Sequence, residues 1–342
     1  MNAMTAKKPT IKDVAQLAGV SFKTVSRVVN NEAWVSDEIK HRVQQAISQL
    51  HYQPNRTARL MRTAPFSLAF VYDNPNSHYV IEMQNGILSE CRQRGFELVI
   101  HPTKAHSTQV LHELSAMIGS NQVGGVILTP PLSENSELIT QLLVQHAKVV
   151  RIVSGAAATD DLCPTLFIDD EHAGYKITRH LLQKGHKTLA FLGYHPDHGS
   201  SVGRYKGFCR ALQEQHIQVN PAWVLSGDFT FDSGVSMTEQ LLTHTHRPTA
   251  LFGCNDEIAA GALFAARLHQ IIVPEQLSIV GFENSPFSRQ TWPTLTTVHQ
   301  PNADIAATAA KMLIALMLNS EHPPQHCGFQ LDIVQRNSVA TI

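Results

Sequence analysis

The chain has 342 residues, a hydrophobic content of 43% and a formal net charge of −1. This length excludes a single small domain and predicts two or three domains of a globular protein. Residues 1–63 hold ten Lys or Arg and four Asp or Glu, a net charge of +6, which leaves −7 for the remainder. A basic amino-terminal segment on an acidic body predicts that this segment binds nucleic acid.

Several classes of protein are disfavoured by the sequence. No stretch approaches 18 apolar residues without a charge, and the first ten residues lack an apolar signal core, so we expect neither export nor a membrane partner. The cysteines form no CxxC pair, and the histidines of His195-Pro196-Asp197-His198 lack recognisable partners, so we expect no metal. GxSxG, HExxH and GxxxxGK[ST] motifs are absent, which argues against an enzyme and a cofactor.

Residues 10–30 predict two short helices joined by a tight turn. Thr10 can cap the first helix, Gly19 can end it in the left-handed conformation, and Ser21 can cap the second. Such a pair forms a helix-turn-helix, whose second helix fits the major groove of DNA. Its expected outer face carries Phe22, Lys23, Thr24, Ser26 and Arg27. The alternative interpretation is an ordinary helical hairpin with these polar side chains merely solvated.

The next segments strengthen the first interpretation. Ser36 is expected to cap a third helix, whose apolar stripe is Ile39, Val43, Ala46, Ile47 and Leu50. The stretches TIKDVAQLAGVS, TVSRVVN, VS and YQPNRTARLMRT follow one another in the order and spacing of a known headpiece. In these segments the chain resembles the LacI family of bacterial transcription regulators.

This resemblance implies a headpiece over residues 1–63, with the helix-turn-helix at about 10–51 and a hinge helix at about 55–63. In the family the hinge helix forms on DNA and inserts an apolar side chain into the minor groove. Met61 stands here at the position where Leu is usual, so the kink can differ. The implied DNA contacts are Thr10, Ser21, Phe22, Lys23, Thr24, Ser26, Arg27, Asn30, Asn55, Ala58, Arg59 and Met61.

From residue 66 the chain alternates short apolar runs with amphipathic stretches, which predicts parallel sheets flanked by helices. We expect a first series of strands at 67–72, 96–101, 124–130 and 149–154. A second series is expected at 165–169, 188–193, 223–227, 249–254 and 277–282. The ligand of such a fold lies at the carboxyl ends of the strands.

The family resemblance extends to this body and implies a periplasmic-binding-protein fold at residues 64–342. The expected fold class is therefore a small all-α headpiece followed by two doubly wound α/β subdomains. By analogy, the chain crosses between the subdomains near residues 165, 299 and 329. The N-subdomain would hold residues 64–165 and 299–328, and the C-subdomain 166–298 and 329–342.

Two motifs of the body carry the candidate effector site. Ser201-Val202-Gly203-Arg204-Tyr205-Lys206-Gly207-Phe208 matches the family pattern S-x-x-R-x-x-G-F/W, whose Arg implies a ligand contact; a surface ion pair is the alternative. Asn255-Asp256 matches N-D-x-x-A-x-G. One of these two residues should cap the following helix, and we expect Asn255 to face the ligand and Asp256 to serve cap and structure.

Further candidates stand where the expected strands end. Asp73 and Asn74 can bind hydroxyl groups or merely form an Asx turn, and Tyr79 can face the ligand or pack in its helix. Glu283 replaces the usual Asp of G-F/Y-D-D, which predicts a shallower pocket or a smaller ligand. Phe229 can stack on a sugar or belong to the core, and Gln300 can touch the ligand or the crossover.

Two classes of function are consistent with these residues. The first is a homodimeric regulator, a repressor that a small effector releases from a palindromic operator. The effector is expected to be a carbohydrate, with a purine or a phosphorylated compound as the alternative. The second class is a sugar-binding protein or an enzyme with a vestigial headpiece. A transport receptor would need an export signal, and hydroxyl binding explains Asp73 and Glu283 more simply than acid–base catalysis does.

Overall fold

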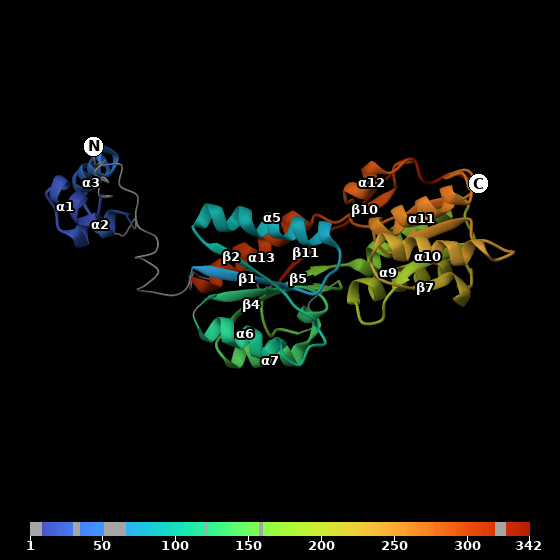
Figure 1. Cartoon of the computed structure of the whole chain (residues 1–342), viewed down its shortest axis with the longest axis horizontal. Helices are drawn as coiled ribbons and strands as arrows, with labels where there is room; N and C mark the ends of the chain where they lie inside the picture. Colours follow the sequence, from blue (N-terminus) through green and yellow to red (C-terminus); the bar gives the residue numbers. More distant parts are fainter. Residues whose placement is uncertain (1–8, 30–34, 51–65, 121, 157–159, 319–325) are drawn as a thin grey trace, which may run out of the picture. The chain divides into compact units, whose positions relative to one another are not determined.

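The computed structural model describes residues 9–29, 35–50, 66–120, 122–156, 160–318 and 326–342. Its contacts divide the chain into two compact units, Met1–Ala64 and Pro65–Ile342. The first unit is helical, and the second contains two parallel sheets with helices (Figure 1). The predicted fold class is therefore confirmed. Within the described ranges, every helix is too short or too polar to span a bilayer.

The first unit contains α1 (Ile11–Ala18), α2 (Phe22–Val29) and α3 (Asp37–Gln49). Their shared core is built from small and β-branched side chains: Val14, Ala15, Ala18, Val25, Val28, Val43 and Ala46. The chain turns between α1 and α2 at Gly19, whose φ of +64° is a conformation that residues with a Cβ rarely adopt. The turn that the sequence predicts is therefore present.

The three predicted cap residues stand at the starts of their helices. At α1, the amide of Thr10 donates to the Asp13 carboxylate over 2.6 Å. At α2, the Ser21 hydroxyl accepts from the amide of Thr24 over 3.1 Å. Ser36 occupies the cap position of α3, as predicted, although its side chain makes no capping hydrogen bond.

The larger sheet of the second unit has six parallel strands in the order β11-β5-β4-β3-β1-β2. They are β1 (Ser67–Tyr72), β2 (Glu97–Pro102), β3 (Gly125–Leu128), β4 (Lys148–Ser154), β5 (Thr165–Ile168) and β11 (His326–Phe329). Helices α5 (Ser77–Arg94) and α13 (Asn302–Met317) cover one face, and α6 (Val110–Gly119) and α7 (Ser136–Val144) cover the other (Figure 1). Successive side chains of a strand point to opposite faces of the sheet, and in β1 the neighbours Phe70 and Val71 accordingly belong to different core clusters.

The smaller sheet has four parallel strands in the order β7-β6-β8-β9. They are β6 (Leu189–Tyr194), β7 (Val224–Ser226), β8 (Ala250–Gly253) and β9 (Ser278–Val280). Helix α8 (Asp170–Gln183) packs on α9 (Gly199–Glu214), and α10 (Phe231–Leu242) packs on α11 (Asp256–Leu268). The short elements are η1 (Leu132–Glu134), η2 (Pro221–Trp223) and α12 (Pro286–Gln290).

The crossings between the subdomains differ from the expectation at one point. Residues 165–169 were expected to open the second series, but β5 pairs with β4 in the larger sheet. The chain therefore leaves this sheet after Ile168. The other crossings run through β10 (Thr297–His299) and β12 (Asp332–Val334), which pair antiparallel. An apolar run indicates a buried strand but not the strand with which it pairs, so the sequence could not assign residues 165–168 to the correct sheet.

Candidate functional site

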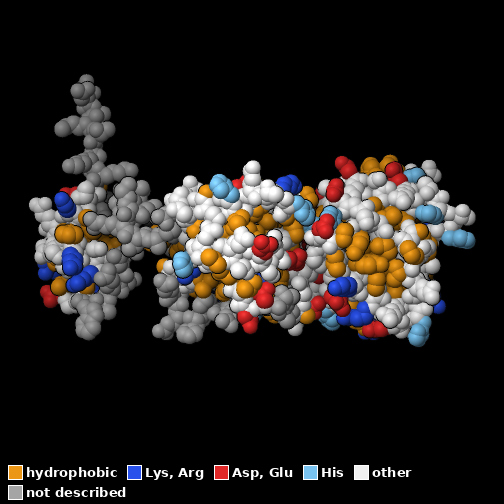
Figure 2. Space-filling view, turned by 90° about the horizontal axis from the view of Figure 1, so that it is seen from below, with side chains coloured by type: hydrophobic (Ala, Val, Ile, Leu, Met, Phe, Trp, Pro, Cys, Tyr) orange, Lys and Arg blue, Asp and Glu red, His pale blue; other side chains and the backbone are white. Residues whose placement is uncertain are grey.

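In the first unit, α2 presents a polar face opposite its buried residues. Phe22 is 59% exposed, and Lys23 and Arg27 are also exposed, whereas Val25 and Val28 point into the core. Thr24 and Ser26 are half-buried on the flank of this face. Lys and Arg side chains lie close together on this unit (Figure 2). The predicted contacts Asn30, Asn55, Ala58, Arg59 and Met61 lie outside the described residues.

The side chains of this face have the chemistry that the major groove requires. Lys23 and Arg27 are donors that suit guanine edges or phosphates, and Phe22 can contact a thymine methyl group. The Ser21 hydroxyl lies 2.8 Å from that of Thr24, so both are held at the start of the helix. The arrangement is that of a recognition helix.

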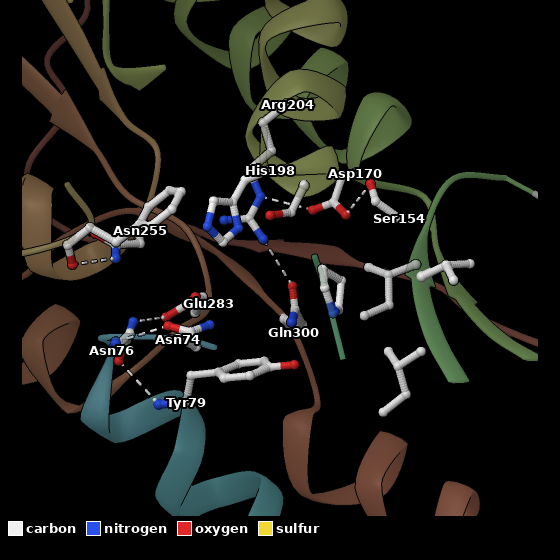
Figure 3. A pocket seen from close by; sticks show the side chains of 16 residues that line it. Asn74, Asn76, Tyr79, Ser154, Asp170, His198, Arg204, Asn255, Glu283 and Gln300 are labelled. Atoms are coloured by element: carbon white, nitrogen blue, oxygen red, sulfur yellow. Dashed lines mark hydrogen bonds and ion pairs between the residues drawn. The ribbon is translucent and has the colours of Figure 1, made fainter. Parts of the chain in front are cut away.

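In the second unit, a cleft of about 570 Å³, measured with its open mouth, lies between the two subdomains. Its lining joins the carboxyl ends of β4 and β5 with the start of α5, the first turns of α8 and α9, and the segment after β9. Figure 3 shows most of these side chains pointing into one space. Seven of the predicted effector residues line it: Asn74, Tyr79, Arg204, Phe229, Asn255, Glu283 and Gln300.

Arg204 is the charged centre of the cleft, and it is held on several sides (Figure 3). Its Nε donates to Asp170 over 2.8 Å, one terminal nitrogen donates to the Cys254 carbonyl over 2.7 Å, and the other to Gln300 over 3.2 Å. Its guanidinium carbon lies 3.6 Å from the ring centre of Phe282. The side chain is only 4% exposed. The alternative of a surface ion pair is therefore wrong.

Asn255 and Asp256 differ from our expectation in one respect, because Asn255 and not Asp256 caps the helix. Asn255 caps α11 by accepting from the amide of Ile258 over 2.7 Å, and it also lines the cleft. Its amide nitrogen donates to the Phe229 carbonyl over 3.0 Å. Asp256 lies outside the cleft lining, where it accepts from the Ser285 amide over 2.6 Å. Asp256 has the structural role that we expected, because this carboxylate holds the segment after β9, and it is not among the residues that line the cleft.

Asp73 is likewise turned away from the cleft. Its carboxylate accepts from the amide of Ala105 over 2.9 Å and from Lys104 over 3.2 Å. Asp73 is therefore not among the residues that line the cleft, because the loop after β2 takes up its oxygens. Asn74 lines the cleft although its side chain also accepts from the Asn76 amide over 2.8 Å. Asn74 therefore both forms the turn and lines the cleft.

Glu283 bridges the two sides of the cleft through Asn76 (Figure 3). Its Oε2 accepts from the Asn76 side-chain nitrogen over 2.9 Å, and the residue is 8% exposed. Burial raises the pKa of Glu283 to about 8. Burial, followed by the nearby Glu283 and Asp170 carboxyls, also raises the pKa of Tyr79 above its ordinary value. The surroundings in the cleft therefore disfavour the ionised forms of Glu283 and Tyr79.

Sequence analysis missed several residues of the site. Asn76, Ser154, Asp170 and Ser200 line the cleft and were not predicted. Asp170 follows β5 and begins α8, and a polar residue at this position of a parallel α/β fold indicates a place in the ligand site. Burial lowers the pKa of His198 to about 4, and its ring lies 5.0 Å from that of Phe229. No cluster that could hold a metal occurs among the described residues.

The two units together define a class of protein: a helix-turn-helix DNA-binding unit joined to a two-subdomain body with a ligand cleft. Residues 10–55 match the model for bacterial regulatory proteins of the lacI family, and residues 178–339 match a periplasmic binding protein-like domain. The HTH-type transcriptional repressor PurR of Escherichia coli O139:H28 is 31% identical over 333 residues, which cover 97% of each protein.

Solved structures agree with this assignment. The lac repressor dimer bound to operator and the anti-inducer ONPF is 26% identical, with a TM-score of 0.77 over 98% of this chain and 100% of that one. The transcriptional regulator CelR in complex with cellobiose is also 26% identical, with a TM-score of 0.72. The match covers 96% of this chain and 99% of that one.

The chain belongs to the LacI family of bacterial regulatory proteins. It is a DNA-binding transcriptional regulator and not an enzyme, so the main interpretation of the sequence is confirmed.

Proposed function

We propose that this regulator represses carbohydrate-utilisation genes and is released from a palindromic operator by a sugar. The observation that carries the proposal is the cleft itself, where carboxylate, amide and guanidinium groups converge beside the rings of Tyr79 and Phe229. Hydroxyl-rich ligands need many fixed donors and acceptors together with flat apolar surfaces. The similarity to CelR, solved with cellobiose, supports the same class of ligand.

The cleft also provides the coupling to the operator. Asn76 and Tyr79 belong to one subdomain, and Arg204 and Glu283 belong to the other. A ligand that touches both sides has a different affinity for the closed and open arrangements, so it shifts the equilibrium between them. Coupling of this kind is typically worth about 1–3 kcal/mol, which changes operator affinity about 5- to 150-fold.

A palindromic operator requires two headpieces, so we propose a homodimer. The lac repressor of similar structure was solved as a dimer bound to operator. On α11, Phe264 and Leu268 are 47% and 58% exposed one turn apart, and Ile272 beyond the helix is 59% exposed. Exposed apolar side chains at this spacing suit a partner surface.

The proposal includes no metal and no bound cofactor, since a diffusible effector suffices for regulation. It places the protein in the cytoplasm with the nucleoid, where operator DNA is found. The proposed residues of the DNA contact remain Thr10, Ser21 and the outer face of α2, with Asn30 and the hinge residues added from the family resemblance.

A thermal-shift screen of the full chain tests the ligand class. A sugar at about 100 times its dissociation constant should stabilise the protein by roughly 2.7 kcal/mol. Operator fragments selected from random DNA should then be released when that sugar is added. Stabilisation by a purine with no response to any sugar would refute the carbohydrate proposal and leave the DNA-binding assignment intact.

A further inference from the structure

The second unit contains another cavity, separate from the effector cleft, with a volume of about 120 Å³. Pro248 and Leu277, which precede β8 and β9, line this cavity. Asn255 and Glu283, which follow the same two strands, line the effector cleft. The two sites therefore lie at opposite ends of the strands of the smaller sheet.

The walls of this second cavity are apolar. Six apolar side chains line it: Leu241, Leu242, Pro248, Leu251, Ile271 and Leu277. Leu241, Leu251 and Leu277 are 1%, 1% and 4% exposed, so these walls belong to the packed core. The hydroxyl of Thr238 also lines the cavity, but it already donates to the Gly234 carbonyl over 2.8 Å. Since an engineered apolar cavity of about 150 Å³ binds benzene, this cavity has room for a chain of about four to six carbons.

The other two side chains of the lining are hydrogen-bond donors. Arg247 is exposed and forms no ion pair with any residue that the structure describes. Gln276 uses its side-chain oxygen to accept from the Ile272 amide over 2.7 Å, which leaves its side-chain nitrogen to donate. The described lining includes neither Asp nor Glu, so no carboxylate there repels a bound anion. A guanidinium binds a carboxylate through two parallel hydrogen bonds.

Helix α10 connects this cavity with the effector cleft. Phe229, which lines the cleft, lies two residues before the helix, and Leu241 and Leu242 at its other end line the second cavity. The helix has 12 residues and is therefore about 18 Å long. A molecule in the second cavity thus packs on the same rigid element that begins at the wall of the cleft.

We propose that the second cavity binds a small aliphatic carboxylate, with its alkyl chain against the leucine side chains and its carboxylate group on Arg247. Each methylene buried in the cavity favours binding, whereas a polar group in the chain would find no partner in the walls. A neutral ligand would leave the guanidinium unused, and a cation would be repelled by it. The proposal does not depend on which compound fills the effector cleft.

A homologous series of acids tests this proposal on the full chain. Isothermal titration at pH 7 with butanoate, hexanoate, octanoate and decanoate should give an affinity that rises about fourfold per methylene and then levels off once the chain fills the cavity. Hexan-1-ol and hexylammonium should bind at least tenfold more weakly than hexanoate. Equal binding by hexanoate and hexan-1-ol would overturn the role of Arg247. An affinity that keeps rising through decanoate would indicate nonspecific adsorption and overturn the site.

Arg247→Gln removes the guanidinium and leaves the apolar walls unchanged. Hexanoate should bind this variant at least tenfold more weakly, whereas the affinity for hexan-1-ol should stay the same. Arg92→Gln, which alters an exposed arginine on α5, is the matched control and should bind hexanoate as the unaltered chain does. Unchanged binding of hexanoate by Arg247→Gln would overturn the proposed contact.

Methyl NMR of the unaltered chain locates the bound acid, because isoleucines mark both sites. Ile271 lines the second cavity, and Ile152 and Ile168 line the effector cleft. Hexanoate should shift the methyl signal of Ile271 and leave those of Ile152 and Ile168 in place. Shifts at Ile152 and Ile168 alone would place the acid in the cleft and overturn the second site. Absence of binding by every acid of the series would also overturn it, and would leave the sugar-responsive function untouched.

Discussion

The substitution Glu283→Gln should change how the stability of the protein depends on pH. Burial raises the pKa of Glu283 from 4.5 to about 8 in the folded protein. Between these values the folded state holds a proton that the unfolded state releases, so the free energy of unfolding falls as pH rises. The contribution of Glu283 to the free energy of unfolding is therefore largest at low pH, and it is lost above about pH 8.

The size of the effect follows from the two pKa values. One pKa unit corresponds to about 1.4 kcal/mol, so the full effect is roughly 4–5 kcal/mol. Between pH 5.5 and 8.5, linkage gives a loss of about 3 kcal/mol for this carboxyl group. Asp256 adds a pH dependence of the same sign, because burial raises its pKa to about 7. It is present in both proteins, so it contributes to the pH dependence of the variant as well as to that of the unaltered chain.

Urea unfolding at pH 5.5 and pH 8.5, followed by tryptophan fluorescence, measures the difference. The unaltered chain should lose about 3 kcal/mol more than Glu283→Gln over this interval. Glu97→Gln serves as the control, since its side chain is exposed, and it should behave like the unaltered chain. Equal losses in all three proteins would refute the reasoning that Glu283 is protonated in the folded protein at low pH.

Three further predictions concern other parts of the molecule. Arg204→Ala should lower the free energy of unfolding by about 3–5 kcal/mol in chemical denaturation, because a buried carboxylate loses its partner; a loss below 1 kcal/mol would contradict this. Gly86→Ala should destabilise by about 1–3 kcal/mol, because its Cβ would lie 2.1 Å from a carbonyl oxygen of α13. Gly119→Ala, with nothing within 4 Å of its Cβ, should stabilise by about 0.5–1 kcal/mol. Lys23→Ala should weaken operator binding by about 1–3 kcal/mol in fluorescence anisotropy, whereas Lys206→Ala in the second unit should not.

Most of the architecture could be predicted from local patterns. The helix-turn-helix follows from apolar spacing and from Gly19, and β1 occupies the predicted residues 67–72. The placement of β5 could not be read in this way, since its apolar residues fit either sheet. Pairing with β4 decides the matter, and pairing depends on contacts between distant segments.

The candidate site could be predicted only in part for a similar reason. Motif spacing identified Arg204 and Asn255, which lie in the cleft. The same spacing could not show that Asp73 turns toward Ala105, or that Asp256 binds the segment after β9. A side chain's direction depends on which donors the fold brings near it, and those donors come from elsewhere in the chain.

The crossings between the subdomains have a consequence for synthesis on the ribosome. The larger sheet is completed at its edge by β11, which comes from the last part of the chain and pairs with β5. Helix α13, which covers one face of this sheet, is also made late. The headpiece is translated first and forms a separate compact unit, so it can fold while the effector body is still incomplete. During that interval a nascent chain presents its DNA-reading helix before it has any cleft through which an effector can act.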